Sequence, residues 1–365
     1  MKILHVIEDL SRGGAERVIV NTLPELQNVG INCEVAILFQ NDDLAEGLEH
    51  QGVKVHRLGL SYKWNVFEAL YKLYTLVKRG KYDIVHANLF FAHFHVGLLS
   101  LFLKNVKTAV TFHNLAFDAY PANTFVKKVR KKIEEFVVKR FDGKIAVSKA
   151  VKEHYEKHLH LKSVDVIYNS FPIERIEKYK TDHHAPNERF TILTPGRLVE
   201  DKGHRYLFEA INILNRRGYD FEFLVVGKGP LEEYCRAQTQ HIKNITLIPE
   251  LTHPKLMKLY NEVDLIVIPS IYEAFGLVVG EAMIMGVPVV ATSVYGIIEI
   301  MKNGEEGLKV PPGDPSALAD AIEKMYLNEP LRKKFVENAQ KKIKQFDIEI
   351  IRLKWKAYYE DLLHG

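Results

Sequence analysis

Residues 264–285 read DLIVIPSIYEAFGLVVGEAMIM, an apolar run of strand length followed closely by a longer apolar stretch. The composition of 264–270 is typical of a parallel strand buried on both faces, and that of 277–285 favours a helix. Two carboxylates, Glu273 and Glu281, stand on either side of the step from strand to helix. Ligands bind beyond the carboxyl ends of the strands in open parallel sheets, so we expect both glutamates at a binding site.

Strand-like runs alternate with amphipathic helical stretches along the whole chain. The runs cover 3–7, 33–39, 53–58, 84–87, 107–111 and 144–147 in the first half, and 191–194, 221–226, 245–248, 265–268, 288–291 and 307–310 in the second. This alternation predicts the α/β class, with two Rossmann-like, doubly wound parallel-sheet domains facing a cleft.

The alternation is interrupted between Asn169 and Arg189, where Pro172, Pro186 and a polar, charged stretch occur. We therefore place an interdomain linker at 173–186, with a first domain at 1–172 and a second at 187–346. Residues 347–365 form a last helical pattern that is rich in aromatic residues.

Composition limits the function classes. A chain of 365 residues with 47% hydrophobic and 26% charged residues suits a soluble globular protein of two domains. A net charge of +4 gives no argument for a nucleic-acid partner. Cys33 and Cys235 lack metal-ligand spacing, so we expect reduced core thiols in a cytoplasmic protein.

No segment resembles a membrane span or a metal site. The longest apolar stretch, 89–103, is too short for a bilayer, and 1–7 is expected to be a first strand rather than a signal peptide. His93 and His95 have no carboxylate or cysteine nearby at ligand spacing, so we expect ordinary helix residues there and no metal site.

Glycines and basic residues follow the first strand of each domain. Arg12, Gly13 and Gly14 precede a helix that runs through Leu26, where backbone N–H groups suit an anion, although a simple tight turn explains them equally well. Gly196 and Arg197, followed by Lys202, are suited to clamp a diphosphate. The alternative for this second group is a solvated basic turn balanced by Glu200 and Asp201.

The sequence Gly227-Lys228-Gly229-Pro230 resembles part of a dinucleotide-binding motif but lacks its third glycine. No Walker lysine motif is present either. Hydride transfer and P-loop chemistry therefore lose their main support.

Two histidines stand at strand ends of the first domain. His113 follows 107–111, and His86 lies in 84–87. We expect His113 at the site and His86 facing the acceptor, with a core or capping role as the alternative.

These motifs together resemble the retaining glycosyltransferases of family 4. The resemblance rests on motifs that occur in the family's order over nearly the whole chain: Gly13-Gly14, His113, Gly196-Arg197 with Lys202, Gly227 to Pro230, and Glu273 to Glu281. It implies the GT-B fold, in which the last helix crosses back to the first domain. The implied reaction moves a sugar from a nucleotide diphosphate sugar to an acceptor, without a metal or other cofactor.

The resemblance also implies roles for single residues. Arg197 and Lys202 would neutralise the diphosphate, Glu281 would bind the ribose, Glu273 and His113 would contact the transferred sugar, and backbone N–H groups of Phe275, Gly276 and Leu277 would hold its hydroxyls or the distal phosphate. Gly13, Gly14, Gly196 and Gly227 are expected to line the donor site, with the base near Pro249 and Leu251. We expect UDP as the nucleotide, GDP as the second choice, and a monomer or weak dimer.

Two loops differ from the family pattern. Asn169-Ser170 stands where the family often has Asn-Gly, and Tyr295-Gly296 precedes Glu299 where a glycine pair is common. The identity of the donor sugar is therefore less determined than the reaction class.

Residues 125–141 combine a helical apolar spacing with a basic cluster that includes Lys127, Lys128, Lys131 and Lys132. Such a helix can rest on an anionic membrane surface and reach a lipid-linked saccharide acceptor at the inner face of the cell membrane. Arg12 is a further candidate for the acceptor side. The alternative is an ordinary helix with its apolar stripe packed inward.

Two other functions share the expected fold. A nucleotide-sugar epimerase would use the same cleft, and a noncatalytic partner would bind a sugar nucleotide without turnover. The paired glutamates and the basic pair favour the transferase.

Overall fold

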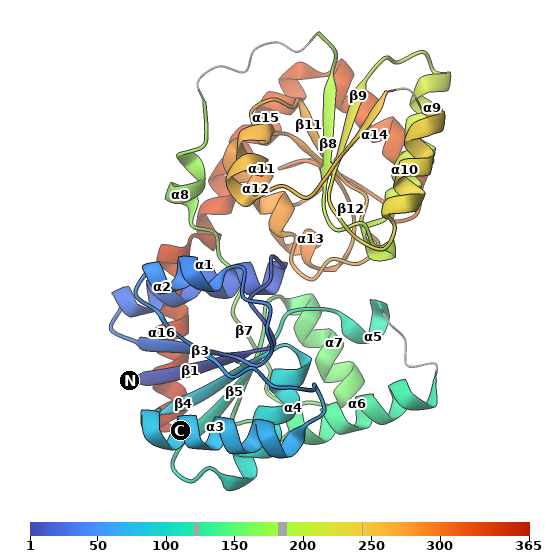
Figure 1. The fold of residues 1–365 in the computed structure, drawn as a ribbon. Helices are drawn as coiled ribbons and strands as arrows, with labels where there is room; N and C mark the ends of the chain where they lie inside the picture. Colours follow the sequence, from blue (N-terminus) through green and yellow to red (C-terminus); the bar gives the residue numbers. More distant parts are fainter. Residues whose placement is uncertain (120–123, 182–187, 243) are drawn as a thin grey trace. The chain divides into compact units, whose positions relative to one another are not determined.

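The computed structural model describes residues 1–119, 124–181, 188–242 and 244–365. Within them the chain divides into two compact units (Figure 1). The first unit comprises Met1–Ser170 and Phe346–Gly365, and the second comprises Phe171–Gln345.

The first unit contains a seven-stranded parallel sheet with the order β3-β2-β1-β4-β5-β6-β7. The strands are β1 Lys2–Ile7, β2 Asn32–Ile37, β3 Lys54–Arg57, β4 Ile84–Asn88, β5 Lys107–Phe112, β6 Gly143–Ala146 and β7 Asp165–Val166. Their apolar side chains are almost entirely buried because helices cover both faces of the sheet.

The helices of the first unit lie on the two faces of its sheet (Figure 1). They are α1 Gly14–Asn28, α2 Ala45–His50, α3 Val66–Gly80, α4 Phe90–Leu99, α5 Ala116–Ala119, α6 Phe125–Val138, α7 Lys149–Leu159 and α16 Ile348–His364, with the short helix η1 Ser100–Phe102. Side chains of Asn65, Thr124 and Ser148 cap α3, α6 and α7 by accepting backbone N–H groups.

Helix α16 confirms that the end of the chain returns to the first domain. It packs against α1, where Arg352 forms an ion pair of 3.1 Å with Glu25. Tyr359 is fully buried, and its hydroxyl lies 2.7 Å from Nδ1 of His86 on β4. The aromatic residues of the last helix therefore complete the core of the first unit.

The second unit contains a six-stranded parallel sheet with the order β10-β9-β8-β11-β12-β13. The strands are β8 Thr191–Pro195, β9 Glu222–Val226, β10 Ile245–Ile248, β11 Leu265–Ile268, β12 Val289–Thr292 and β13 Leu308–Val310. The helices are α8 Ile173–Glu177, η2 Glu200–Lys202, α9 His204–Arg216, α10 Glu232–His241, α11 His253–Tyr260, α12 Leu277–Met285, α13 Tyr295–Ile300, α14 Pro315–Leu327 and α15 Glu329–Ile343. The short helix η3 Lys344–Phe346 spans the boundary between the two units.

These sheets confirm the α/β class and the two Rossmann-like domains, and each of the twelve expected runs forms a strand. The two-residue strand β7 has no counterpart among those runs. Cys33 and Cys235 are both buried free thiols, one in each unit, as expected.

The first part of the segment 173–186, which was expected to be a linker, is folded. Ile173 and Ile176 are buried, and α8 contacts α12. Thr181 N–H donates to Oδ1 of Asn261 at 3.2 Å. Residues 173–181 therefore pack within the second unit, while 182–186 lie outside the described residues.

Close backbone approaches join the ends of β8, β9 and β10. Gly196 N–H donates to Val226 O at 2.9 Å, and Gly227 N–H donates to Ile248 O at 3.1 Å. A Cβ atom on Gly227 would lie 1.9 Å from the carbonyl oxygen of Gly196, whereas a Cβ on Gly196 would meet only the Lys202 side chain, at 3.9 Å. The backbone of Gly196 therefore leaves no space for a side chain at position 227, which explains the glycine there without reference to a ligand.

We predict that Gly227→Ala destabilises the second unit by about 1–3 kcal/mol, because the added methyl group displaces the backbone of the neighbouring loop. Urea unfolding followed by circular dichroism measures the loss. Gly196→Ala is the matched control and should leave the unfolding midpoint nearly unchanged. Equal effects of the two changes would contradict this packing argument.

Candidate functional site

The order of the second sheet reverses between β8 and β11. In open parallel sheets such a reversal opens a crevice at the carboxyl ends of the strands, where ligands bind. The loop after β8 carries Arg197 and Lys202, and the loop after β11 carries Glu273. Three of the expected site residues therefore come from the two loops that flank this point.

Backbone hydrogen bonds hold the two loops together. The N–H of Ile271 donates to Asp201 O at 2.7 Å, and that of Tyr272 donates to the same oxygen at 3.3 Å. Lys202 and Glu273 follow these anchor residues directly in each loop. Their relative position is thus fixed by the backbone rather than by flexible side chains.

Lys202 and Glu273 form an ion pair, with Nζ 2.6 Å from Oε2. Both side chains are partly buried. Arg197 is exposed, and none of the carboxylates in the described part of the chain pairs with it. The site thus combines one paired cation with one exposed cation.

Helix α12 begins beside Glu273. Gly276 is its N-terminal cap, with a φ of 93° that favours glycine, and no side chain caps the helix. Phe275 and Gly276 are buried and Leu277 is partly buried. The first-turn N–H groups carry the positive end of the helix dipole, which suits an anionic group.

Glu281 is buried one turn further along α12. Its Oε1 lies 3.0 Å from Nε2 of His253, the first residue of α11. The sequence did not predict His253 as a site residue. The one sequence signal for it is its position just after Pro249 and Leu251, which were expected near the base. Pro249 is exposed and Leu251 partly buried in the same loop after β10.

The loop that departs from the family pattern contacts the Glu273 segment. Gly296 N–H donates to Glu273 O at 3.0 Å, and the Tyr295 ring stacks on Tyr272 with centroids 5.6 Å apart. Tyr295-Gly296 therefore supports the backbone of the site residue.

In the first unit, Gly13 caps α1 and Arg12 and Gly14 are exposed beside it. Glu16 lies in the first helical turn, and a Cβ on Gly13 would meet its carboxylate. The N-terminus of α1 already has an acidic side chain beside it, which weakens its attraction for another anion.

His86 does not face an acceptor. It is buried, and its two ring nitrogens lie 2.7 Å from the Tyr359 hydroxyl and 2.7 Å from Oγ1 of Thr111. The expectation fails because His86 lies within β4 beneath α16, where both nitrogens have internal partners. His93 and His95 are also internal, bonded to the carbonyl groups of Thr111 and Lys63.

His113 lines a small cavity between the sheet, α1 and α16. The cavity is also lined by His5, His86, Asn88, Thr111 and Tyr359. Nε2 of His113 lies 3.1 Å from Oδ1 of Asn88. Burial lowers the pKa of His5 and that of His113 to about 3, and lowers that of His86 as well, so these rings are neutral at pH 7.

We predict that the buried His5 makes the protein sensitive to acid. Its pKa is about 3 in the folded protein and about 6.5 in an unfolded chain. Between these pH values the unfolded chain binds a proton that the folded protein does not, so acidification favours unfolding by about 1.4 kcal/mol per pH unit. His5→Leu should lower the measured slope by this amount, since neither nitrogen of His5 has a partner among the described residues. The buried His86 and His113 keep their own contributions to the slope.

Urea unfolding at several pH values between about 7 and 5 tests this prediction. His50→Leu, at an exposed position on α2, is the control and should keep the native slope. If the dependence of the unfolding free energy on pH is the same in His5→Leu as in the native protein, the prediction is wrong.

Helix α6 exposes much of its apolar stripe. Phe125 is 81% exposed and Val126 74% exposed, and Lys127, Lys128 and Lys132 are exposed beside them. Lys131 is partly buried, with Nζ 3.4 Å from Nδ1 of His158. Packing of the stripe into the core therefore does not explain the first turns of α6, although Val137 and Val138 at its end are buried.

Helix α3 carries a second exposed aromatic stripe that the sequence analysis missed. Phe67, Tyr71 and Tyr74 lie on one face, and Phe67 is 89% exposed. Helix α4 contacts both α3 and α6, and the three helices lie over the same side of the sheet (Figure 1). None of the described helices is long and apolar enough to cross a bilayer.

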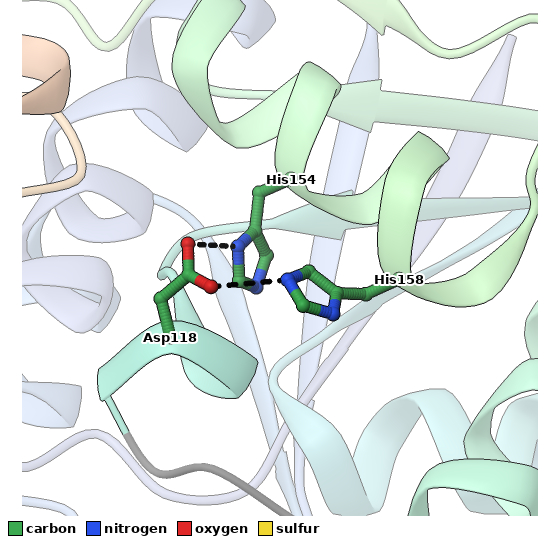
Figure 2. Close-up of side chains that lie close together, drawn as sticks. All are labelled: Asp118, His154 and His158. Atoms are coloured by element: carbon green, nitrogen blue, oxygen red, sulfur yellow. Dashed lines mark hydrogen bonds and ion pairs between the residues drawn. The ribbon is translucent and has the colours of Figure 1, made fainter.

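Among the described residues, Asp118, His154 and His158 form a cluster whose ligand atoms lie close enough together to suggest a metal site (Figure 2). The Asp118 carboxylate lies 3.0 Å from Nδ1 of His154 and 3.0 Å from Nε2 of His158. However, Phe117 N–H donates to Nε2 of His154, and Lys131 donates to Nδ1 of His158. Metal-bound imidazoles donate from their second nitrogen, whereas both of these accept, so the cluster fits a hydrogen-bonded clamp between α5 and α7.

Two family models match adjacent parts of the chain. The model for glycosyl transferases group 1 matches residues 175–342, and that for glycosyltransferase family 4 matches residues 12–175. The chain belongs to these glycosyltransferases. The family resemblance that the motifs suggested is thereby confirmed.

Curated relatives are glycosyltransferases as well. The capsular polysaccharide biosynthesis glycosyltransferase CapM of Staphylococcus aureus is 33% identical over 192 residues, which cover 51% of this chain and 49% of the relative. An uncharacterised glycosyltransferase of Methanocaldococcus jannaschii is 28% identical over 336 residues, or 85% of each chain.

Solved structures share the GT-B fold of this glycosyltransferase. Sucrose-phosphate synthase from Thermosynechococcus elongatus superposes with a TM-score of 0.85 at 21% identity, covering 100% of both chains. Anabaena HepE in complex with UDP and glucose gives a TM-score of 0.84 at 21% identity, covering 99% of this chain and 100% of that one. At this identity the likeness establishes the fold.

Proposed function

We propose that this glycosyltransferase transfers a sugar from UDP-sugar, with retention of configuration, to a hydroxyl group of a saccharide or lipid-linked saccharide. The Lys202–Glu273 pair carries the proposal, because it places a cation and a carboxylate together at the loops that flank the reversal of the second sheet. A structural neighbour holds UDP and glucose, which favours UDP over GDP.

The reaction breaks the bond between the anomeric carbon and the oxygen of the distal phosphate, and UDP departs with the bonding electrons. The acceptor oxygen forms the new bond to the anomeric carbon on the same face, and its proton passes to the departing phosphate. Negative charge therefore develops on the diphosphate, and preorganised donors there lower the barrier.

Residues of the second unit match these demands. Arg197 and Lys202 neutralise the diphosphate, and the first-turn N–H groups of α12 hold its distal phosphate or hydroxyls of the sugar. Glu273 contacts the transferred sugar, and the Lys202 contact orients its carboxylate. Glu281 holds the ribose, with His253 fixing one of its oxygens. Because the charge is met by side chains and a helix, we propose that no metal is needed.

We predict that Arg197→Ala and Lys202→Ala each lower turnover about a hundredfold or more, since each removes a preorganised donor to developing charge. Glu273→Gln should lower it strongly as well. The measurement is release of the nucleoside diphosphate by purified protein from a panel of donors, as UDP from UDP-sugars and GDP from GDP-sugars. Lys341→Ala, at an exposed position on α15, is the control.

The outcomes separate the competing functions. Binding of nucleotide sugar without turnover by the native protein would favour a noncatalytic partner and contradict the transferase. An altered sugar stereocentre without a new glycosidic bond would indicate an epimerase. The anomeric configuration of a true product, read by NMR, tests retention.

We also propose that the first unit rests on an anionic membrane surface through α6. The exposed Phe125 and Val126 can enter the headgroup region while Lys127, Lys128 and Lys132 meet anionic lipids. CapM and a phosphatidyl-myo-inositol mannosyltransferase of Mycobacterium leprae, 26% identical over 287 residues (77% of this chain and 74% of that relative), suggest cell-surface polysaccharides or glycolipids as the products.

We predict that changing Lys127, Lys128 and Lys132 to Gln lowers binding to anionic vesicles, since each lysine near such a surface contributes about 1 kcal/mol. Flotation with vesicles containing phosphatidylglycerol measures binding. Changing Lys333, Lys334 and Lys341 on α15 to Gln removes the same charge and should have little effect. Absence of binding by the native protein would rule out the membrane proposal.

A further inference from the structure

Tyr295 has a backbone conformation that tyrosine seldom adopts. It lies shortly after β12, as the first residue of the short helix α13, and its φ is 33°. In this left-handed region the Cβ atom of an L-residue crowds a carbonyl oxygen of the backbone, which costs free energy. Glycine adopts the same conformation without that cost. The chain therefore has a tyrosine at a position whose backbone geometry favours glycine.

The segment that begins with Tyr295 packs directly against the loop of Glu273. The N–H of Gly296 donates to Glu273 O at 3.0 Å. A Cβ atom on Gly296 would lie 2.2 Å from the carbonyl oxygen of Ala274 and 2.4 Å from Cα of Phe275. The backbone next to Tyr295 is thus in contact with the part of the chain that leads from Glu273 into α12.

The ring of Tyr295 stacks on that of Tyr272, the residue before Glu273. The ring centroids lie 5.6 Å apart, and the planes of the rings differ by 25°. The N–H of Tyr272 donates to Asp201 O at 3.3 Å, so a backbone contact fixes Tyr272 as well. Both tyrosines are partly buried. Since tyrosine side chains have few rotatable bonds, the stacked rings form a rigid aromatic surface next to Glu273.

Support of the loop does not account for the ring. The hydrogen bonds that hold the loop come from main-chain atoms of Gly296 and Asp201, and a change of Tyr295 to glycine would keep them. What the tyrosine adds is the bulk of its side chain. Residues in costly backbone conformations cluster at ligand sites, where the surrounding structure holds them in place. The position of Tyr295 therefore indicates a role toward the ligand of Glu273.

We propose that Tyr295 restricts which sugar the donor can carry. Its ring fills space next to Glu273, so the site takes a UDP-hexose and discriminates against the corresponding UDP-N-acetylhexosamine, whose acetamido group clashes with the ring. This inference rests on the proposed function, which puts the transferred sugar at Glu273. All of the residues that carry it belong to the second unit, Phe171–Gln345.

Isothermal titration calorimetry tests this preference without turnover. The ligands are UDP-glucose and UDP-galactose, each compared with its N-acetylated counterpart, and UDP alone, which measures the fraction of each variant that has a folded site. The native protein should bind the unsubstituted donors about 10- to 100-fold more tightly. In Tyr295→Gly this preference should be lost through a gain in affinity for the N-acetylated donors. A native protein without the preference would overturn the proposal.

Three further variants separate the bulk of the ring from other effects. Tyr295→Asn also removes the ring, and because asparagine tolerates the left-handed region it should behave like Tyr295→Gly. Tyr295→Phe keeps the ring and should keep the native preference. Tyr71→Asn, at an exposed position on α3 in the first unit, is the control and should keep it too. An equal loss of affinity for every donor in Tyr295→Gly and Tyr295→Asn would show that the ring only supports the loop, and would overturn the proposal.

Turnover of the same donors gives the second test. Release of UDP yields kcat/KM for each donor, and Tyr295→Gly should raise the ratio of the N-acetylated to the unsubstituted donor about 10- to 100-fold. A gain of activity with a larger sugar is an effect that the loss of a structural support does not produce. An unchanged ratio in the folded variant would contradict the role of Tyr295.

Failure of this proposal is distinguishable from failure of the proposed function. Binding that prefers UDP-hexoses and depends on Tyr295, without turnover of any nucleotide sugar, would contradict the transferase and still support the role of Tyr295 in donor recognition. Turnover with the same preference in the native protein and in Tyr295→Gly would overturn that role and leave the transferase intact.

Discussion

The second unit depends on backbone segments that pack directly against each other at the carboxyl ends of its central strands. Asp201 O accepts N–H groups from the loop after β11, and the carbonyl of Gly196 leaves no room for a side chain on Gly227. Because these backbone contacts are short and directional, the positions of the strands fix the positions of the loops that follow them. The distance between Lys202 and Glu273 is therefore set by the positions of the strands that carry their loops.

The sequence was sufficient to predict the elements of the fold but not the contacts between distant residues. The strands were predictable since both faces of each sheet are covered, which makes nearly every strand residue apolar. Strand β7 was too short for that signal, and Ile173 and Ile176 lay in a stretch whose overall composition was polar. His253 was missed because its partner, Glu281, comes from another element far along the chain.

Helical spacing showed which residues share a face but not which face is buried. On α3 the core side consists of Ala69, Leu73 and Val77, and an aromatic stripe on another side is left to solvent. The histidines show the same limit. His86 and His113 both stand at strand ends in the sequence and line the same cavity, but both ring nitrogens of His86 have internal partners, one of them on α16. No local pattern reveals that a helix from the end of the chain lies over His86.

The place of α16 also has a consequence for synthesis on the ribosome. The first unit needs residues 346–365 for its core, including the fully buried Tyr359, while the second unit is continuous from 171 to 345. The second unit therefore has all of its residues before the first does, although domains generally fold from the N-terminus onward during translation. Until the last helix emerges, the nascent first unit exposes the apolar surface around His5 and His86, and exposed apolar surface of this kind favours aggregation.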